Sequence, residues 1–190
     1  MRPENTSHRE PDPPDELLMQ RAAAGEQRAF AALVTRHQDP LVNFFRRLGA
    51  YTDAEDLAQE TFVRLFNCRE RYRPTAKFTT FLYTIARHAW LDLLRKAKRR
   101  EAFEENLKQD CPASHDGGMG RTRLRMDAQA ALERLPEKLR SVVVLNLYQG
   151  LRYDEIAAVL DIPTGTVKSR MFNALIQLKE IFENEDPGSD

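Results

Sequence analysis

The sequence predicts an all-α fold made of two small helical domains joined by a flexible linker. Apolar residues recur at three- and four-residue steps over most of the chain, the period of an amphipathic helix. No segment shows a convincing strand pattern, because the β-branched run at 142–145 lies within a longer helical window. Turn-forming and small polar residues cluster at 110–118, and so long a loop is unusual inside one compact domain.

Length and composition restrict the class of protein. The chain has 190 residues, of which 42% are hydrophobic and 31% charged, as expected for a soluble, folded protein of one domain or two small ones. No apolar stretch approaches the roughly 20 residues of a membrane span, and the N-terminus lacks a secretory signal. Cys68 and Cys111 lack metal-ligand spacing. We therefore expect a cytoplasmic protein without membrane insertion, metal or cofactor.

The first domain is expected at 15–100, after a disordered, Pro-rich tail at 1–14. Helical spacing begins at Asp15. Asp39 and Pro40 have the types expected at the N-cap and first position of a helix that Gly49 would end.

A second helix is expected to open at Thr52, with Glu55 three residues later in a capping box. A third follows Pro74 and runs to about Arg100. Beyond it we expect the linker at 101–126, a second helical domain at 127–182 and an acidic tail at 183–190.

Charge is unevenly distributed although the formal net charge is zero. Residues 71–100 contain nine basic residues and one acidic residue, a balance of +8, whereas residues 1–70 carry −3. A basic stretch of this size suits a polyanion, although a solvated surface is the alternative.

Residues 153–172 have the spacing of a helix-turn-helix. Ala157 provides a small residue where two helices cross, and Asp161 stands at the turn, where a left-handed conformation is needed. Pro163 ends the turn and Thr164 is expected to cap the second helix. An ordinary pair of packed helices is the alternative. The apolar residues expected to lock both helices to the core are Ile156, Leu160, Ile162, Val167 and Met171.

Taken together, these blocks resemble the bacterial RNA polymerase sigma factors, especially the extracytoplasmic-function (ECF) subfamily. The resemblance covers 15–100 and 127–182. The matching blocks are 53–62 for region 2.2, 78–87 with Asp92 and Arg95 for regions 2.3 and 2.4, 132–136 with Arg140 for the opening of region 4, and 152–175 for region 4.2.

The resemblance implies a sigma factor that binds core RNA polymerase and directs it to promoters, under the control of an anti-sigma factor. The region 2.2 helix would dock on polymerase, although a solvated acidic face is the alternative for that helix taken alone. The implied core-polymerase-binding residues are Asp53, Glu55, Asp56, Gln59 and Glu60.

The same resemblance implies that the basic stretch holds the separated strand of the minus-10 element, using cations on the backbone and aromatic rings on unpaired bases. The position of Trp90 is left open between DNA and a partner helix. The implied minus-10 DNA-binding residues are Arg71, Tyr72, Arg73, Lys77, Tyr83, Arg87, His88, Arg95 and Lys96.

The second helix of the helix-turn-helix would read the minus-35 duplex. His88, Arg152, Asn173 and Leu175 depart from the family pattern, and the last two make this helix less basic than usual. The implied minus-35 DNA-binding residues are Thr164, Gly165, Thr166, Lys168, Ser169, Arg170 and Asn173.

The two alternative functions are a standalone helix-turn-helix regulator and a nucleotide-dependent enzyme. A standalone helix-turn-helix regulator would bind duplex DNA tightly without polymerase. A nucleotide-dependent enzyme lacks support because the chain has no GxxxxGK[ST] loop. We therefore expect a sigma factor that is not an enzyme by itself.

Overall fold

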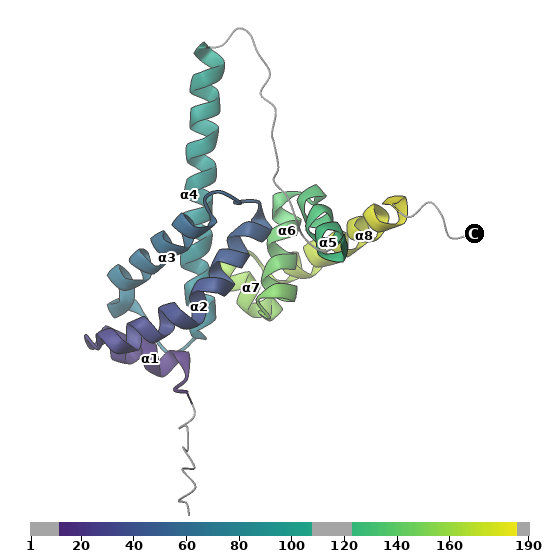
Figure 1. The fold of residues 1–190 in the computed structure, drawn as a ribbon. Helices are drawn as coiled ribbons and strands as arrows, with labels where there is room; N and C mark the ends of the chain where they lie inside the picture. The colour runs from purple at the N-terminus through teal and green to yellow at the C-terminus, as the bar shows by residue number, and fades with distance from the viewer. Residues whose placement is uncertain (1–11, 108–122, 186–190) are drawn as a thin grey trace, which may run out of the picture.

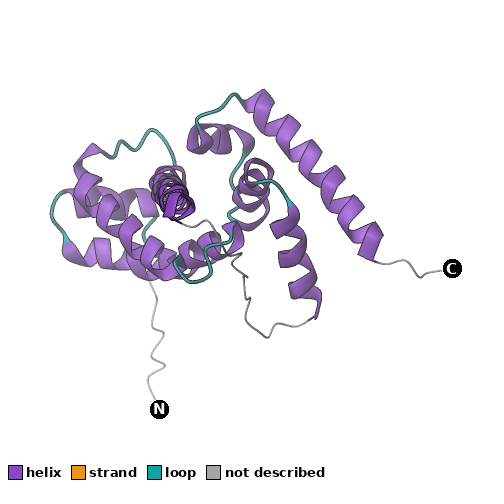
Figure 2. Cartoon of the chain, turned by 90° about the horizontal axis from the view of Figure 1, so that it is seen from above, coloured by secondary structure: helices purple, strands orange, loops and turns teal. Residues whose placement is uncertain are grey.

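The computed structural model describes residues 12–107 and 123–185. All regular structure within these ranges is helical (Figure 2). The all-α prediction with two helical domains is thus confirmed. The expected disorder at 1–11, the centre of the expected linker at 108–122 and the end of the acidic tail at 186–190 lie outside the described residues.

The first domain is a helical bundle around an apolar core (Figure 1). Its elements are α1 (Asp15–Ala23), α2 (Gln27–Leu48), α3 (Ala54–Cys68), the 3₁₀ turn η1 (Arg69–Arg71) and α4 (Phe78–Leu107). The largest fully buried side chains of this core include Leu33, Phe44, Phe45, Leu65, Phe78 and Leu82. The C-terminal part of α4 extends well beyond the bundle (Figure 1).

The second domain contains the helix-turn-helix. Its elements are α5 (Arg123–Arg134), α6 (Glu137–Val143), η2 (Val144–Tyr148), α7 (Tyr153–Leu160) and α8 (Thr164–Glu185). The run at 142–145 is helical as expected, but η2 is a π-helical segment, which the sequence pattern did not indicate.

The predicted helix start at Asp39 and Pro40 is wrong, because α2 runs through Pro40 without interruption. A proline inside a helix removes one backbone hydrogen bond. Leu33, His37 and Leu41 are nevertheless buried on one continuous face of α2, and this packing on both sides of the proline holds the helix together. Its end is as predicted: Gly49 adopts a left-handed φ of 107°.

The predicted capping box at Thr52 and Glu55 is also wrong. Asp53 is the N-cap of α3 and makes no side-chain cap, and the Thr52 hydroxyl donates to the Asp53 carboxylate over 3.0 Å. Glu55 instead accepts from the guanidinium of Arg46 on α2, at 2.9 Å. An ion pair between helices therefore replaces the local cap.

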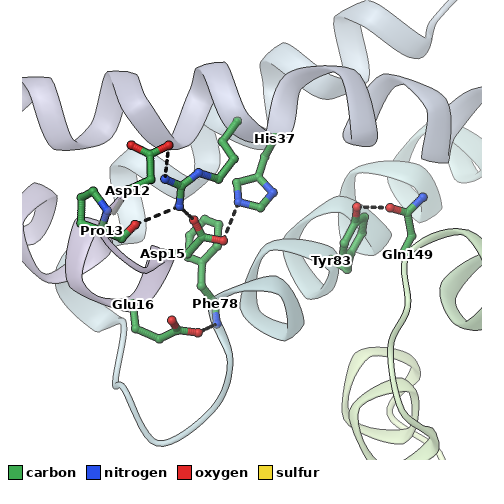
Figure 3. Close-up of polar contacts among 9 residues, drawn as sticks. Asp12, Pro13, Asp15, Glu16, His37, Phe78, Tyr83 and Gln149 are labelled. Carbon is green, nitrogen blue, oxygen red and sulfur yellow. Dashed lines mark hydrogen bonds and ion pairs between the residues drawn. The ribbon is translucent and has the colours of Figure 1, made fainter. Parts of the chain in front are cut away.

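Two acidic residues in α1 tie it to the rest of the first domain (Figure 3). Asp15 accepts from the Arg36 guanidinium and lies 2.8 Å from Nε2 of His37. Glu16 accepts a hydrogen bond from the backbone amide of Phe78, the first residue of α4, at 3.0 Å. A free amide at the start of α4 is thus satisfied by a side chain 62 residues away.

Helix extends into both ends of the segment expected to be a linker. α4 continues to Leu107 and α5 begins at Arg123. Residues 101–107 are mostly Glu, Ala and Leu, which favour helix even where the apolar spacing thins.

The two domains pack against one another. α4 contacts α7, and α2 contacts η2, where the guanidinium of Arg47 near the end of α2 lies over the ring of Tyr148. The buried apolar residues form one continuous cluster that runs from the first domain into the second.

Candidate functional site

The five residues expected to bind polymerase form an exposed ridge on α3 and the turn before it, here called the acidic ridge: Asp53, Glu55, Asp56, Gln59 and Glu60. Apolar residues of α3, including Leu57, Phe62 and Leu65, face the core instead. The structure therefore brings the predicted residues together on one accessible face.

The acidic ridge separates two shallow grooves. Glu55 and Gln59 border the first, between α2 and α3, which has Val34, Val42 and Phe62 as its apolar lining. The contribution of α2 to this surface was not predicted from the sequence. The sequence nevertheless contains a signal for it. Val34 and Val42 are eight residues apart and so share one side of a helix.

Asp53, Asp56 and Glu60 border the second groove, between α3 and α4. Here the Arg64 guanidinium donates to Glu60 over 2.8 Å and to Asp92 over 2.9 Å, and Arg95 donates to Asp92 over 2.8 Å. The hydrogen bond from Arg64 holds the pKa of Asp92 below its ordinary value, assisted by Arg95. Asp92, the one acidic residue of the basic stretch at 71–100, thus accepts hydrogen bonds from two arginines.

Most of the basic side chains expected to bind the minus-10 strand are accessible. Arg87 is half-buried, and the exposed members are Arg71, Arg73, Lys77, His88, Arg95 and Lys96.

The aromatic members of the minus-10 set are buried in this conformation. Tyr72 is 6% exposed and lies 5.4 Å, between ring centroids, from Phe81. Tyr83 is 2% exposed, its ring centroid lies 5.0 Å from that of Phe44, and burial raises its pKa. Trp90, left open by the sequence, is 7% exposed. None of the three presents a ring face on which a base could stack.

The helix-turn-helix forms as its spacing predicts. Asp161 has φ 50° and ψ 53° after α7, the left-handed conformation expected at the turn. Ile156 and Val167 are fully buried, and Leu160 and Met171 nearly so. Ala157 and Ile162 are partly buried against the same core, and the Ile162 amide donates to the Ala157 carbonyl over 3.1 Å.

The turn conformation gives a test of the local fold. Replacing Asp161 with valine should lower the free energy of unfolding by about 1–2 kcal/mol, because a β-branched residue tolerates positive φ poorly. Asparagine, which tolerates it well, should leave stability unchanged. Urea unfolding of the wild type and the two variants measures the change in stability. Equal stability of the valine and asparagine variants would contradict a left-handed conformation at residue 161.

The start of α8 differs from the prediction in one detail. Thr164 is its first helical residue, and the carbonyl of Pro163 accepts from the amides of Thr166 and Val167 at 2.9 and 3.2 Å. Pro163 thus takes the capping position that was expected of Thr164.

The residues expected to read DNA lie on the outer side of α8. Thr166 and Arg170 are half-buried, and Lys168 and Arg170 form no ion pair with the described residues. The exposed members of the set are Thr164, Gly165, Lys168, Ser169 and Asn173.

Glu155, in the first turn of α7, has a role that the sequence pattern did not indicate. One of its carboxylate oxygens accepts from the Arg152 amide at 2.7 Å, and the other lies 2.9 Å from Nζ of Lys77 in the first domain. Burial opposes its charged form, but the Arg152 amide and the Lys77 ammonium together hold the pKa of Glu155 below its ordinary value. A single carboxylate therefore caps a helix and joins the two domains.

Comparison with known proteins assigns both domains. The sigma-70 region 2 family model matches residues 33–100, and the sigma-70 region 4 model matches residues 125–178. The ECF RNA polymerase sigma-E factor of Haemophilus influenzae is 31% identical over 183 residues, covering 90% of this chain and 94% of that relative. This chain belongs to the ECF family of RNA polymerase sigma factors.

Solved structures similar to this ECF sigma factor span both of its domains. The structure of CnrH in complex with the cytosolic domain of CnrY has a TM-score of 0.70 and 27% identity, covering 90% of this chain and 99% of that one. The sigma factor RpoE of Bartonella quintana, solved with the anti-sigma factor NepR, has a TM-score of 0.68 and 25% identity, covering 81% and 96%. Among the described helices of this chain, none combines the length and apolar character of a membrane span.

Proposed function

We propose that this chain is a dissociable initiation subunit that binds core RNA polymerase and directs it to a subset of promoters by recognising minus-10 and minus-35 elements. It is not an enzyme by itself and acts in the cytoplasm, where the chromosome is. The observation that carries the proposal is the division of charge. The chain has an exposed acidic ridge on α3, a basic stretch along α4 and the loop before it, and on α8 the side chains of Lys168 and Arg170, which form no ion pair with the described residues.

The acidic ridge supports the polymerase-binding part of the proposal. Its carboxylates suit a basic partner surface, and the groove between α2 and α3 adds the apolar side chains of Val34, Val42 and Phe62 beside Gln59. A charged rim around a small apolar area is a common composition for a protein–protein interface. We therefore place core polymerase on this side of α3.

The basic stretch supports binding of the separated minus-10 strand. Arg71, Arg73 and Lys77 lie before α4, and Lys96 is exposed on α4 without an ion pair in the described residues. These cations can follow a phosphate backbone. Tyr72 and Tyr83 can stack on bases only after a rearrangement that exposes their rings.

The helix-turn-helix supports reading of the minus-35 duplex through α8. Alanine at both Lys168 and Arg170 should weaken binding of the polymerase complex to a promoter fragment by about tenfold or more and reduce the slope of log K against log salt by about 2. Filter binding across a salt series measures both.

A matched control removes two exposed lysines of the same domain that lie away from the start of α8, Lys138 and Lys179. Alanine at these positions should leave the slope unchanged. An unchanged slope in the Lys168 and Arg170 variant would remove α8 from the DNA interface.

An anti-sigma factor is the proposed regulator. The support is the similarity to RpoE of Bartonella quintana, which was solved with the anti-sigma factor NepR. Such a partner would compete for the surfaces that bind polymerase or DNA.

Two binding measurements test the proposed function. Size-exclusion chromatography with purified core polymerase should show a stable complex, and the chain alone should bind promoter duplex weakly, since residues 127–180 hold seven basic and seven acidic residues. Tight duplex binding by the free chain, with no complex with core polymerase, would favour a standalone regulator instead.

A further inference from the structure

Helix α1 contacts the elements on both sides of the loop that leads into α4, namely η1 and α4 itself. The sigma-70 region 2 model matches from residue 33 onward, so α1 lies before the part of the domain that the model covers. The loop, residues 73–77, is exposed along its whole length and carries Arg73 and Lys77, two cations proposed to bind the minus-10 strand. Contacts that fix the ends of this loop therefore fix where the two cations lie.

Polar contacts hold the start of α1 against α2 (Figure 3). The Arg36 guanidinium donates to the Asp15 carboxylate and, over 3.0 Å, to the Pro13 carbonyl. The second Asp15 oxygen lies 2.8 Å from Nε2 of His37, which is 8% exposed. The other face of α1 packs into the core through Leu18, Met19 and Ala22. The position of α1 is thus fixed independently of the loop.

From this fixed position, α1 holds the residue that follows the loop. The half-buried Glu16 accepts the hydrogen bond from the Phe78 amide at 3.0 Å, and the ring centroid of Phe78 lies 5.1 Å from that of His37. A carboxylate at this place also interacts favourably with the dipole of α4. The C-terminal end of the loop is therefore attached to α1 and α2 through both its backbone and its neighbouring ring.

Tyr72 holds the loop from its inner side. Its hydroxyl donates to the Ala76 carbonyl over 3.3 Å, and its ring centroid lies 5.4 Å from that of Phe81. Burial, together with the charges of Glu16 and Asp15, raises the pKa of the Tyr72 hydroxyl, which therefore stays protonated and able to donate. Stacking on a base would require this ring to leave its place, whereas the hydrogen bond to Ala76 uses the ring where it lies.

The charges of α1 point to a role in positioning. Glu16 and Asp15 place two carboxylates near a loop whose Arg73 and Lys77 are proposed to contact phosphates. By charge alone, acidic residues near such a loop weaken the binding of a polyanion. A loop that is already ordered, however, loses less conformational entropy when a strand binds to it.

We propose that α1 is a brace for the minus-10 site, in which Glu16 and Tyr72 are positioning residues that hold the 73–77 loop in the conformation that receives the separated strand. Asp15 fixes the brace to α2. The inference rests on the proposed function, because that function assigns this loop to the minus-10 strand.

Hydrogen exchange in the free chain tests the brace without polymerase or DNA. Glu16→Ala should accelerate exchange of the Phe78 amide at least about tenfold, because a hydrogen bond to a charged acceptor is lost. Glu16→Gln keeps an oxygen acceptor in the same place, so its Phe78 amide should remain protected. Nuclear magnetic resonance measures the exchange rates. Equal rates in the wild type and Glu16→Ala would overturn the brace.

Binding to an opened promoter tests whether the brace acts on DNA. The probe is a fragment of a promoter that the chain transcribes from a genomic library, with its minus-10 segment held open by mismatches. Glu16→Ala should weaken binding of the polymerase complex about tenfold, although it removes a negative charge. Glu16→Gln should bind within about twofold of the wild type, since it keeps the acceptor. Unchanged or stronger binding by Glu16→Ala would overturn the positioning role.

A matched control removes a negative charge elsewhere in the same part of the chain. Glu26 is exposed between α1 and α2, and Glu26→Ala should not weaken binding. Equal weakening by Glu26→Ala and Glu16→Ala would overturn the role of the hydrogen bond to Phe78. Equal weakening by Glu16→Ala and Glu16→Gln would overturn it as well, because only one of them removes the acceptor.

Tyr72→Phe provides a second variant should Glu16→Ala fail to fold. It keeps the buried ring and any capacity to stack, and removes only the hydroxyl that donates to Ala76. It should also weaken binding to the opened fragment, and binding equal to that of the wild type would overturn the role of Tyr72 in the brace.

The two measurements separate this inference from the proposed function. If the wild-type polymerase complex does not bind the opened fragment, the proposed function fails and the positioning role fails with it. If the wild type binds and Glu16→Ala loses amide protection without losing affinity, the brace contributes only to stability, and this inference alone is overturned.

Discussion

Reversing the charge of Glu55, Asp56 and Glu60 together to lysine should reduce affinity for core polymerase at least about a hundredfold. All three side chains are exposed, so the fold does not depend on their burial. Close charge pairs at interfaces have measured coupling energies of about 1.5–7 kcal/mol, and each reversal replaces an attraction with a repulsion. Fluorescence titration of labelled chain with core polymerase measures the loss.

A matched control reverses three other exposed acidic residues: Glu26, Glu70 and Glu180. This control has the same net charge as the test variant and should bind core polymerase as the wild type does. Circular dichroism should confirm that α3 remains helical, because lysines in a first helical turn oppose the helix dipole by about 0.3–1 kcal/mol each. Equal affinities of the two variants would show that the acidic ridge is only a solvated surface.

Replacing Ile156 with alanine should lower the free energy of unfolding of the second domain by about 2–5 kcal/mol. Ile156 is fully buried between α7 and the rest of its domain, so the substitution leaves a cavity at the centre of the helix-turn-helix. Binding to a minus-35 duplex by the polymerase complex should fall with it, because α8 loses the support of α7. Urea unfolding monitored by circular dichroism measures the stability.

The matched control makes the same change at Ile176, which is 43% exposed on α8. Its effect should stay within about 0.5 kcal/mol, since little apolar surface is lost from the core. A comparable loss of unfolding free energy in the Ile156 and Ile176 variants would contradict the packing described for the helix-turn-helix.

Local sequence signals predicted most of the fold. The spacing of apolar residues located the helices, Gly49 ended α2 as expected, and the turn at Asp161 follows from the few residues that tolerate a left-handed conformation. Five acidic-ridge residues share an exposed face because helical periodicity alone decides which side of α3 meets the core.

The features that were predicted wrongly or not at all depend on contacts between residues distant in the sequence. The residue types at Asp39 and Pro40 predict a helix start because helix propensity is a local property. Burial of side chains on both sides of Pro40 instead keeps α2 continuous. Glu55 was expected to cap its own helix but pairs with Arg46 of α2. Likewise, nothing near Phe78 indicates that Glu16 caps α4.

The same limit applies to the candidate site. The sequence identified Tyr72 and Tyr83 as aromatic residues in a basic stretch, but only the three-dimensional packing shows that both rings are buried. The ion pair of Lys77 and Glu155 joins the two domains, and no spacing along the chain encodes that contact. The basic side chains of the same stretch are mostly exposed, as their charge leads one to expect, whereas the burial of the two rings depends on packing that the sequence does not show.

The central claim is that this ECF sigma factor directs core polymerase to particular promoters, and transcription in vitro tests it most directly. Purified core polymerase, a genomic promoter library and the chain should together give a discrete set of transcripts that is absent without the chain. The variant with Glu55, Asp56 and Glu60 reversed should give none of them. The same transcripts from core polymerase alone, or no selective transcripts with the wild-type chain, would contradict the account.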